Sequence, residues 1–424
     1  MSRMALEGLR IIDLSQAWAG PYATKLLGDM GAEIIKVEAA RRMDSTRGAV
    51  RVPPGIQWGL YPNKEPGERP YNRAGYFNKY GRNKCGITLD LTAEKGKEVF
   101  KRLVKVSDVV VENFAAGVMT RLGLDYPVLR EVKPDIIMVC MPAMGMTGPE
   151  KDYVGYGVTI EQLAGLVSIT GYLGDVPMKS GINYGDPIAG IAAAGYLLAA
   201  ISYRLRTGKG QLIDISQRET TATLIGDTIM DYSMNKRVQT HMGNRHPSLA
   251  PHGCYRCQGE DMWVTIAVGS DAEWQALCRV MGKPELGRDE RFADVLSRHR
   301  NQDELDAIIG EWTKERDHYE VMHSLQSAGV MAGAVLNPQE VVEDPHLDAR
   351  GFYEEVDHPE AGSYRYAGPS WKLSKTPGGI HKPAPCLGEH NDYVYRDILG
   401  MSEQEVAELA EAGIISNIPI EQTL

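Results

Sequence analysis

The sequence predicts an α/β protein with a large Rossmann-like domain built on a parallel sheet, and a smaller α+β domain. With 424 residues, of which 43% are apolar, the chain is too long for one hydrophobic core. Its first third alternates short apolar, β-branched segments with helical ones, as parallel sheets require. From about Gly253 to Val335, amphipathic helices and an alternating hairpin replace that pattern.

The first domain begins with a strand, a helix and a strand. These are LRIIDLS, then AGPYATKLLGDMG with Pro21 at the first helical position, and then AEIIKVE. Further strands are expected in GITLDLT, DVVVENF and PDIIMVCMP, with a helix around EKGKEVFKRLVKV. This alternation predicts parallel strands flanked by helices.

The composition of the chain disfavours several classes of function and location. A net charge of -10 disfavours general affinity for nucleic acid or anionic membranes, and the N-terminus has no signal-peptide pattern. The uncharged run 187–203 falls just short of a membrane span and predicts a buried helix. Six scattered cysteines are typical of reduced thiols, so we expect a cytoplasmic protein. Cys254 and Cys257 lack the further ligands of a zinc site and fit the hairpin better.

The sequence gives little support for a dinucleotide-binding site or for a serine or cysteine nucleophile. Glu38 ends the second strand as the ribose-binding acid of a dinucleotide site would, but Gly20 stands alone and Pro21 removes a backbone donor. No G-x-S-x-G elbow or thiol-enzyme signature is present either.

Asp186, between a loop and an apolar helix, is the third candidate. Local sequence favours an N-cap, with Pro187 at the first helical position. A functional role is also open, because Gly185 leaves the carboxylate accessible and a helix N-terminus favours an anion. The two roles are compatible.

The chain resembles the class III CoA-transferase family, which includes formyl-CoA transferase and carnitine CoA-transferase, with α-methylacyl-CoA racemase as a side branch. The resemblance runs in a shared order through nearly the whole chain. Its segments are IIDLSQAWAGPYATKLLGDMGAEIIKVE, GRNKCGITLDL, SDVVVENFAAGVMTRLGLDY, KPDIIMVCMPAMGMTGP, GINYGDPIAG, YRLRTGKGQLIDIS, GNRHPSLAPHG, AGAVLNPQEVVEDPHLDARGF and APCLGEHN.

The resemblance implies that Asp186 is the catalytic carboxylate. It would attack the donor thioester to form a mixed anhydride, then carry CoA as an aspartyl thioester, and finally pass CoA to the acceptor acid. The CoA thioester is a substrate, and no permanently bound cofactor or metal is expected.

The family's CoA and substrate site carries over to nine positions. They are Gln16, Ala17, Trp18, Leu89, Asn113, Phe114, Arg121, Tyr156 and Gly185. An arginine of formyl-CoA transferase corresponds to Ala39, which leaves Arg41 or Arg42 as substitutes for phosphate binding.

Two departures from formyl-CoA transferase bear on the substrate. Trp18 stands where that enzyme has a glutamine, which argues against an oxalate-sized acid, and the glycine-run loop is absent. With Tyr156, these features suggest succinyl-CoA as donor and an aromatic or substituted dicarboxylic acid, such as benzylsuccinate, as acceptor.

Two alternatives stay open. One is an acyl-CoA racemase or isomerase, disfavoured because Tyr156 replaces the basic histidine of that branch. The other is a supporting subunit of a heteromeric CoA-transferase, against which the Gly185-Asp186 pair argues.

The resemblance also implies an interlocked, ring-shaped dimer, either of identical chains or with a paralogous subunit. Residues 1–215 would form the large domain with the CoA and catalytic site, and 216–250 a linker. Residues 251–335 would form the small domain, and 336–424 would return to the large one.

Overall fold

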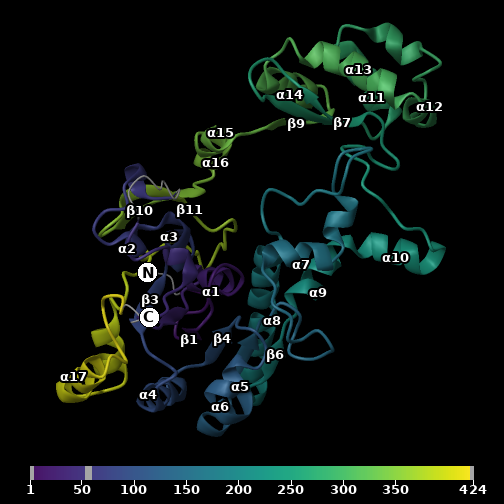
Figure 1. Cartoon of the computed structure of the whole chain (residues 1–424). Coiled ribbons are helices and arrows are strands. Elements are labelled where there is room, and N and C mark those ends of the chain that lie inside the picture. The colour runs from purple at the N-terminus through teal and green to yellow at the C-terminus, as the bar shows by residue number, and fades with distance from the viewer. Residues whose placement is uncertain (1–3, 53–59, 421–424) are drawn as a thin grey trace. The chain divides into compact units, whose positions relative to one another are not determined.

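A computed structural model describes residues 4–52 and 60–420 of the chain (Figure 1). The chain divides into two compact units. The first comprises Met1–Leu166, Ser180–Lys236 and Ala349–Leu424, and the second Val167–Lys179 and Arg237–Asp348. The first unit therefore contains both ends of the chain. The interlocked dimer and the sequence-based domain boundaries stay predictions.

The first unit is built on a six-stranded sheet with the order β3-β2-β1-β4-β5-β6. All its neighbouring strands are parallel, with Ile12 of β1 paired to Ile35 of β2 and to Val110 of β4. The predicted parallel α/β architecture is thus confirmed. The strands are β1 (Arg10–Asp13), β2 (Glu33–Glu38), β3 (Lys84–Thr88), β4 (Val109–Glu112), β5 (Ile137–Cys140) and β6 (Leu212–Asp214).

Helices cover both faces of this sheet, and a separate hairpin of β10 (Tyr353–His358) and β11 (Gly362–Ala367) belongs to the same unit. The segment 217–235, expected to be linker, carries two of the helices. The helices are α1 (Ala19–Asp29), α2 (Pro70–Arg73), α3 (Gly75–Gly81), α4 (Glu94–Lys105), α5 (Val118–Leu122), α6 (Tyr126–Val132), α7 (Gly157–Leu163), α8 (Gly185–Thr207), α9 (Gln217–Ala222), α10 (Gly226–Asn235) and α17 (Glu403–Glu411).

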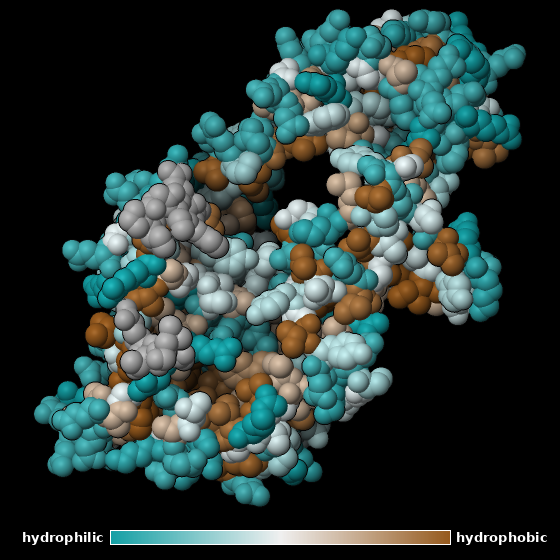
Figure 2. All heavy atoms as spheres, viewed as in Figure 1, coloured by the Kyte–Doolittle hydropathy of each residue, from teal (hydrophilic) through white to brown (hydrophobic). Residues whose placement is uncertain are grey.

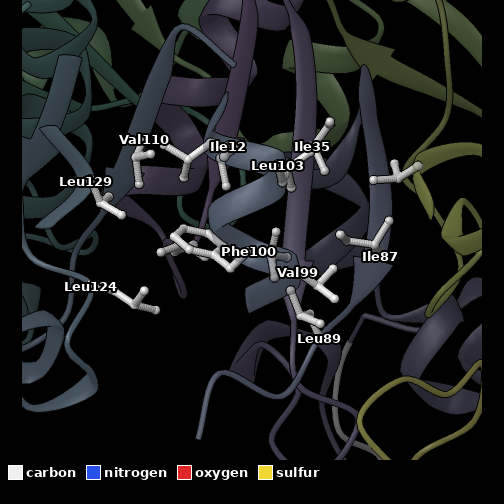
Figure 3. Close-up of a cluster of buried hydrophobic side chains, with 14 of the residues drawn as sticks. Ile12, Ile35, Ile87, Leu89, Val99, Phe100, Leu103, Val110, Leu124 and Leu129 are labelled. Carbon is white, nitrogen blue, oxygen red and sulfur yellow. The ribbon is translucent and has the colours of Figure 1, made fainter. Parts of the chain in front are cut away.

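Two apolar cores hold the sheet. On one face Phe100 and Leu103 of α4 pack against Ile12, Ile35 and the other strand residues seen in Figure 3. On the other face α1 and α8 pack side by side, and both contribute small apolar residues. The helices approach closely at Gly190, where a Cβ atom would lie 2.6 Å from the carbonyl oxygen of Ala19.

Helix α8 is long and apolar enough, by length and composition, to cross a membrane, and no other helix of the described residues is. Its inner face, with Ala193 and Leu197, lies in the core, as expected for a buried helix. Its outer face differs from that expectation, because Ile191, Tyr196 and Leu205 are exposed.

The C-terminal segment covers the outer edge of the sheet, where β3 has no neighbouring strand on one side. The His390 amide donates to the Gly86 carbonyl at 2.9 Å, and the Thr88 amide donates to Asn391 Oδ1 at 3.0 Å. The Tyr395 hydroxyl, on a π-helical turn (Tyr393–Ile398), donates to the Thr88 carbonyl at 2.6 Å. These bonds satisfy backbone groups that an edge strand would otherwise leave open.

The second unit is a three-stranded antiparallel sheet with the order β7-β8-β9, covered by helices around Trp274. Strands β7 and β8 form the hairpin expected around Cys254, which confirms that prediction. Among the described residues no cluster of His, Cys, Asp or Glu suits a metal ion. The elements are β7 (His252–Arg256), β8 (Trp263–Ala267), β9 (Met331–Val335), α11 (Asp271–Val280), α12 (Val295–Arg300), α13 (Gln302–Thr313), α14 (His318–Ser327) and α15 (Pro338–Val342), followed by α16 (Pro345–Ala349).

Candidate active site

The strand order reverses between β1 and β4, and two of the predicted residues meet there. The Gln16 amide donates to Asn113 Oδ1 at 2.7 Å, and Asn113 Nδ2 donates to the Gln16 carbonyl at 2.8 Å. Open parallel sheets bind ligands in the crevice at such a reversal, beyond the carboxyl ends of the strands. The Asn113 side chain is therefore used to fix the main chain after β1.

Buried charges hold the loop that follows β1. Ala17 has a left-handed backbone (φ 63°), and its amide donates to Asp44 Oδ1 at 3.2 Å. The Lys36 ammonium pairs with Asp44 at 3.0 Å and also donates to the Ser15 carbonyl. Because both members of the ion pair are buried, removing one would leave the other charge unpaired.

Asp186 lies in the first turn of α8, one residue after Gly185, which begins the helix. The prediction that Asp186 caps this helix, with Pro187 first in it, is wrong. Tyr184 is the N-cap residue, and no side chain donates or accepts a capping bond there. The Asp186 carboxylate instead turns across to α1, where the Ala19 backbone amide donates to it.

Burial sets the protonation of this carboxylate. The pKa of Asp186 is raised to about 6. Burial is the main cause, the hydrogen bond from Ala19 partly opposes it, and the nearby Glu161 carboxylate adds to it. Ala19 is the first residue of α1, so the amide that reaches Asp186 is one the helix leaves unpaired. The site therefore holds an acid that is largely ionised at neutral pH yet poorly solvated.

Glycines make room for the carboxylate. A Cβ atom at Gly157, the first residue of α7, would lie only 2.1 Å from Asp186 Oδ2. A Cβ atom at Gly185 would lie 2.8 Å from Ile160 Cγ2. Tyr156 precedes Gly157 as the N-cap residue of α7, and its side chain is 73% exposed. The predicted residues Tyr156, Gly185 and Asp186 are thus brought together.

A second carboxylate supports the segment before Asp186. Glu161 on α7 is fully buried, and it accepts hydrogen bonds from the Tyr184 amide and from Ser180 Oγ, the latter at 3.3 Å. Glu161 was not singled out from the sequence. An acid within an apolar helical stretch was the only signal that could have drawn attention to it.

Aromatic residues from α1 and α3 lie beside Asp186, and sequence reasoning identified only Trp18 among them. Trp18 packs against Tyr76 and Tyr80 with ring centroids 6.2 and 5.7 Å apart. Burial raises the pKa of both tyrosines, and the charge of Asp186 raises it further. The side chains of Trp18, Tyr76 and Tyr80 are called the aromatic wall below. The Tyr-x-x-x-Tyr spacing of α3 was the signal available in the sequence.

The remaining predicted residues lie in the core or on the exposed surface. Leu89 is 1% exposed and belongs to the core, and Phe114 packs against the same core. Arg121 is exposed on α5, and Arg41 and Arg42 are exposed after β2. Their parts in CoA binding stay predictions.

The chain matches a family model along most of its length. The model describes CoA-transferase family III and matches residues 6–391.

Curated relatives and solved structures agree with this match. The succinyl-CoA–D-citramalate CoA-transferase of Chloroflexus aurantiacus is 33% identical over 97% of this chain and 98% of its own length. The succinyl-CoA:mesaconate CoA-transferase of Haloarcula marismortui is 36% identical over 91% and 94%. The crystal structure of a CAIB/BAIF family protein from Brucella suis has a TM-score of 0.82 and 31% identity, and covers 93% of this chain and 100% of that one.

Proposed function

Because the chain belongs to CoA-transferase family III, we propose that it moves CoA from succinyl-CoA to a second carboxylic acid, with Asp186 as nucleophile. The observation that carries the assignment of Asp186 is its environment. The carboxylate is half-buried, next to two glycines and the N-terminus of α1, and its pKa is raised to about 6. Reduced solvation strengthens a carboxylate as a nucleophile while leaving it ionised at neutral pH.

The proposed reaction consists of balanced acyl transfers. An Asp186 oxygen attacks the thioester carbon of the donor, the C–S bond breaks, and CoA leaves as thiolate. The thiolate then attacks the Asp186 carboxyl carbon and releases the donor acid, leaving an aspartyl-CoA thioester. The acceptor carboxylate attacks this thioester to form a second anhydride, from which the thiolate takes the acceptor acyl group and frees Asp186.

Backbone donors support the charged intermediates. The Ala19 amide already reaches the Asp186 carboxylate, and it can stabilise the oxyanion that forms when the carboxyl carbon is attacked. Gly157 keeps the space beside Oδ2 free of side-chain atoms. The protein would therefore contribute a positioned nucleophile and preorganised donors.

The names of three related enzymes support the proposal that this protein acts on dicarboxylic acids. Their names give succinyl-CoA or succinate together with D-citramalate, glutarate or mesaconate, each a dicarboxylic acid. The bulk of Trp18 beside Asp186 favours an acid larger than oxalate. We therefore propose succinyl-CoA as donor and a substituted dicarboxylic acid, such as benzylsuccinate, as acceptor.

The nucleophile is tested by substitution. Protein incubated with succinyl-CoA and a panel of dicarboxylic acids should form new acyl-CoA esters, resolved by liquid chromatography. Asp186→Ala should abolish the exchange and leave CoA affinity, measured by calorimetry, nearly unchanged. Exchange that survives Asp186→Ala would refute the assignment.

An isotope label tests the covalent route more directly. In the proposed sequence one oxygen of the acceptor acid remains on Asp186 after each turnover. Acceptor acid labelled with heavy oxygen should therefore label the peptide that contains Asp186, as detected by mass spectrometry. Direct transfer between the two acids would leave that peptide unlabelled.

We further propose a cytoplasmic dimer, with identical chains or a paralogous partner. Apolar side chains are exposed in the part of the first unit that carries α7 and α10 (Figure 2). The exposed residues near these helices include Tyr153, Val154, Tyr156, Ile229, Met230, Tyr232 and Met234. Exposed apolar surface that is contiguous is typical of interfaces. A native mass spectrum with only monomer would contradict the dimer.

A further inference from the structure

We propose that Lys79 binds the distal carboxylate of the dicarboxylic substrate, the one that takes no part in CoA transfer. The inference rests on the proposed function of Asp186, because it specifies which acids that site accepts. It adds a positively charged subsite, formed by Lys79 on the aromatic wall, to a site otherwise described by its nucleophile.

Lys79 shares one face of α3 with two residues of the aromatic wall. Tyr76, Lys79 and Tyr80 are spaced by three and four positions, so their side chains lie together on the helix. The Lys79 ammonium lies 5.2 Å from the Trp18 ring centroid and 4.8 Å from that of Tyr80. The charge is thus held against the rings that neighbour Asp186.

This ammonium lacks an anionic partner. Throughout residues 4–52 and 60–420, no carboxylate lies within ion-pair distance of Lys79. By contrast, Lys36 and Lys84, in the same unit, are paired with Asp44 and Asp13. A cation that contacts rings on one side and lacks a counter-ion is suited to an incoming anion.

The buried phenol of Tyr80 is a second feature beside Lys79. Tyr80 is only 2% exposed, and its hydroxyl interacts with the neighbouring phenol of Tyr76. A carboxylate oxygen accepts a stronger hydrogen bond than a second phenol does, so a bound carboxylate could take the place of that interaction. Lys79, which is exposed, and the neighbouring phenols therefore offer a cation and hydroxyl donors, which suit a carboxylate.

Different elements carry this subsite and the reacting end of the site. Asp186 lies on α8, and its carboxylate meets Gly157 of α7 and Ala19 of α1. Lys79 comes from α3, a different element. An acid with a carboxylate at each end could place one at Asp186 and the other at Lys79, whereas a monocarboxylic acid of equal length would leave Lys79 without a counter-ion.

The experiment compares succinate with butyrate, which has the same chain length and lacks the distal carboxylate. Calorimetry at saturating CoA would measure both affinities for the native protein, Lys79→Met, Lys79→Arg and Lys105→Met. Lys105 is the matched control, because it is exposed at the end of α4, on the other face of the sheet. The KM of succinyl-CoA and that of butyryl-CoA would be measured for the same proteins.

We expect Lys79→Met to weaken succinate binding by about ten- to hundredfold and to raise the KM of succinyl-CoA by a similar factor. This is the usual effect of losing a charge-assisted hydrogen bond. Butyrate, butyryl-CoA and free CoA should be unaffected, Lys79→Arg should retain most of the preference, and Lys105→Met should match the native protein. Unchanged succinate binding, or a native protein that binds succinate no better than butyrate, would overturn the inference.

Equal weakening of both acids or of free CoA would overturn it as well, since Lys79 would then serve the shared carboxylate or the CoA phosphates. The proposed function fails by a different result, namely exchange that persists in Asp186→Ala. The binding measurements with succinate and butyrate would still decide the role of Lys79.

Discussion

The space beside the Asp186 carboxylate allows a sharp prediction for Gly157→Ala. The added Cβ atom would lie 2.1 Å from Asp186 Oδ2, whereas ordinary contact begins at 3.4 Å. The carboxylate must therefore move by about 1.3 Å, the difference between these two distances, or α7 must move instead. Gly157 does not have a left-handed backbone, so alanine adds no backbone strain there.

We expect this displacement to lower kcat about a hundredfold, because misplacing a reacting group by about 1 Å costs roughly that much. The assay is the initial rate of acyl-CoA formation from succinyl-CoA and an accepted acid. Affinity for free CoA should stay close to the native value, since Gly157 lies beside the nucleophile and not at the Gln16–Asn113 pair.

Gly310→Ala provides the matched control. Gly310 lies on helix α13 of the second unit, and a Cβ atom there would have no neighbour within 4 Å. This variant should retain the native rate and be as stable or slightly more stable, because alanine favours helix. A folded Gly157→Ala variant with a native rate would show that the carboxylate tolerates displacement, and would refute the reasoning.

Two further predictions concern charge. The pKa of Asp186 in the folded protein is about 6, raised from 3.8, so the rate of CoA transfer should fall as the pH drops below about 6. The raised pKa also means that the ionised carboxylate destabilises the folded protein above that pH. Asp186→Asn should therefore abolish exchange. It should also raise the free energy of unfolding at pH 7, measured by urea titration, by up to about 3 kcal/mol. An unchanged or lower free energy of unfolding would contradict the argument from burial. Lys36→Met should leave the Asp44 charge buried and unpaired and lower the free energy of unfolding by about 3–5 kcal/mol. Lys97→Met is its control, because its partner Glu94 is 84% exposed and the pair should contribute less than about 1 kcal/mol. Equal losses in the two variants would refute the distinction.

Sequence periodicity predicted strands β1 to β5 of the sheet and the hairpin around Cys254, because these depend on local patterns of apolar residues. The capping prediction for Asp186 failed for the opposite reason. Its carboxylate is oriented by the Ala19 amide, a partner 167 positions away that only the packing of α1 against α8 brings near. Lys79 and Tyr80 were missed because their spacing marks a helix face, while what that face meets depends on tertiary structure.

The covering of β3 by the C-terminal segment has a consequence for biosynthesis. On the ribosome, β1 to β5 emerge hundreds of residues before Val394, Tyr395 and Leu409, which complete the core on the α4 face. Until then the edge of β3 and part of that core face water, whereas the second unit has its own core and all its strands by residue 335. The nascent chain must therefore keep the unfinished sheet from associating with other protein chains while the second unit folds first. Premature termination of translation near the C-terminus would release the protein with this sheet edge uncovered.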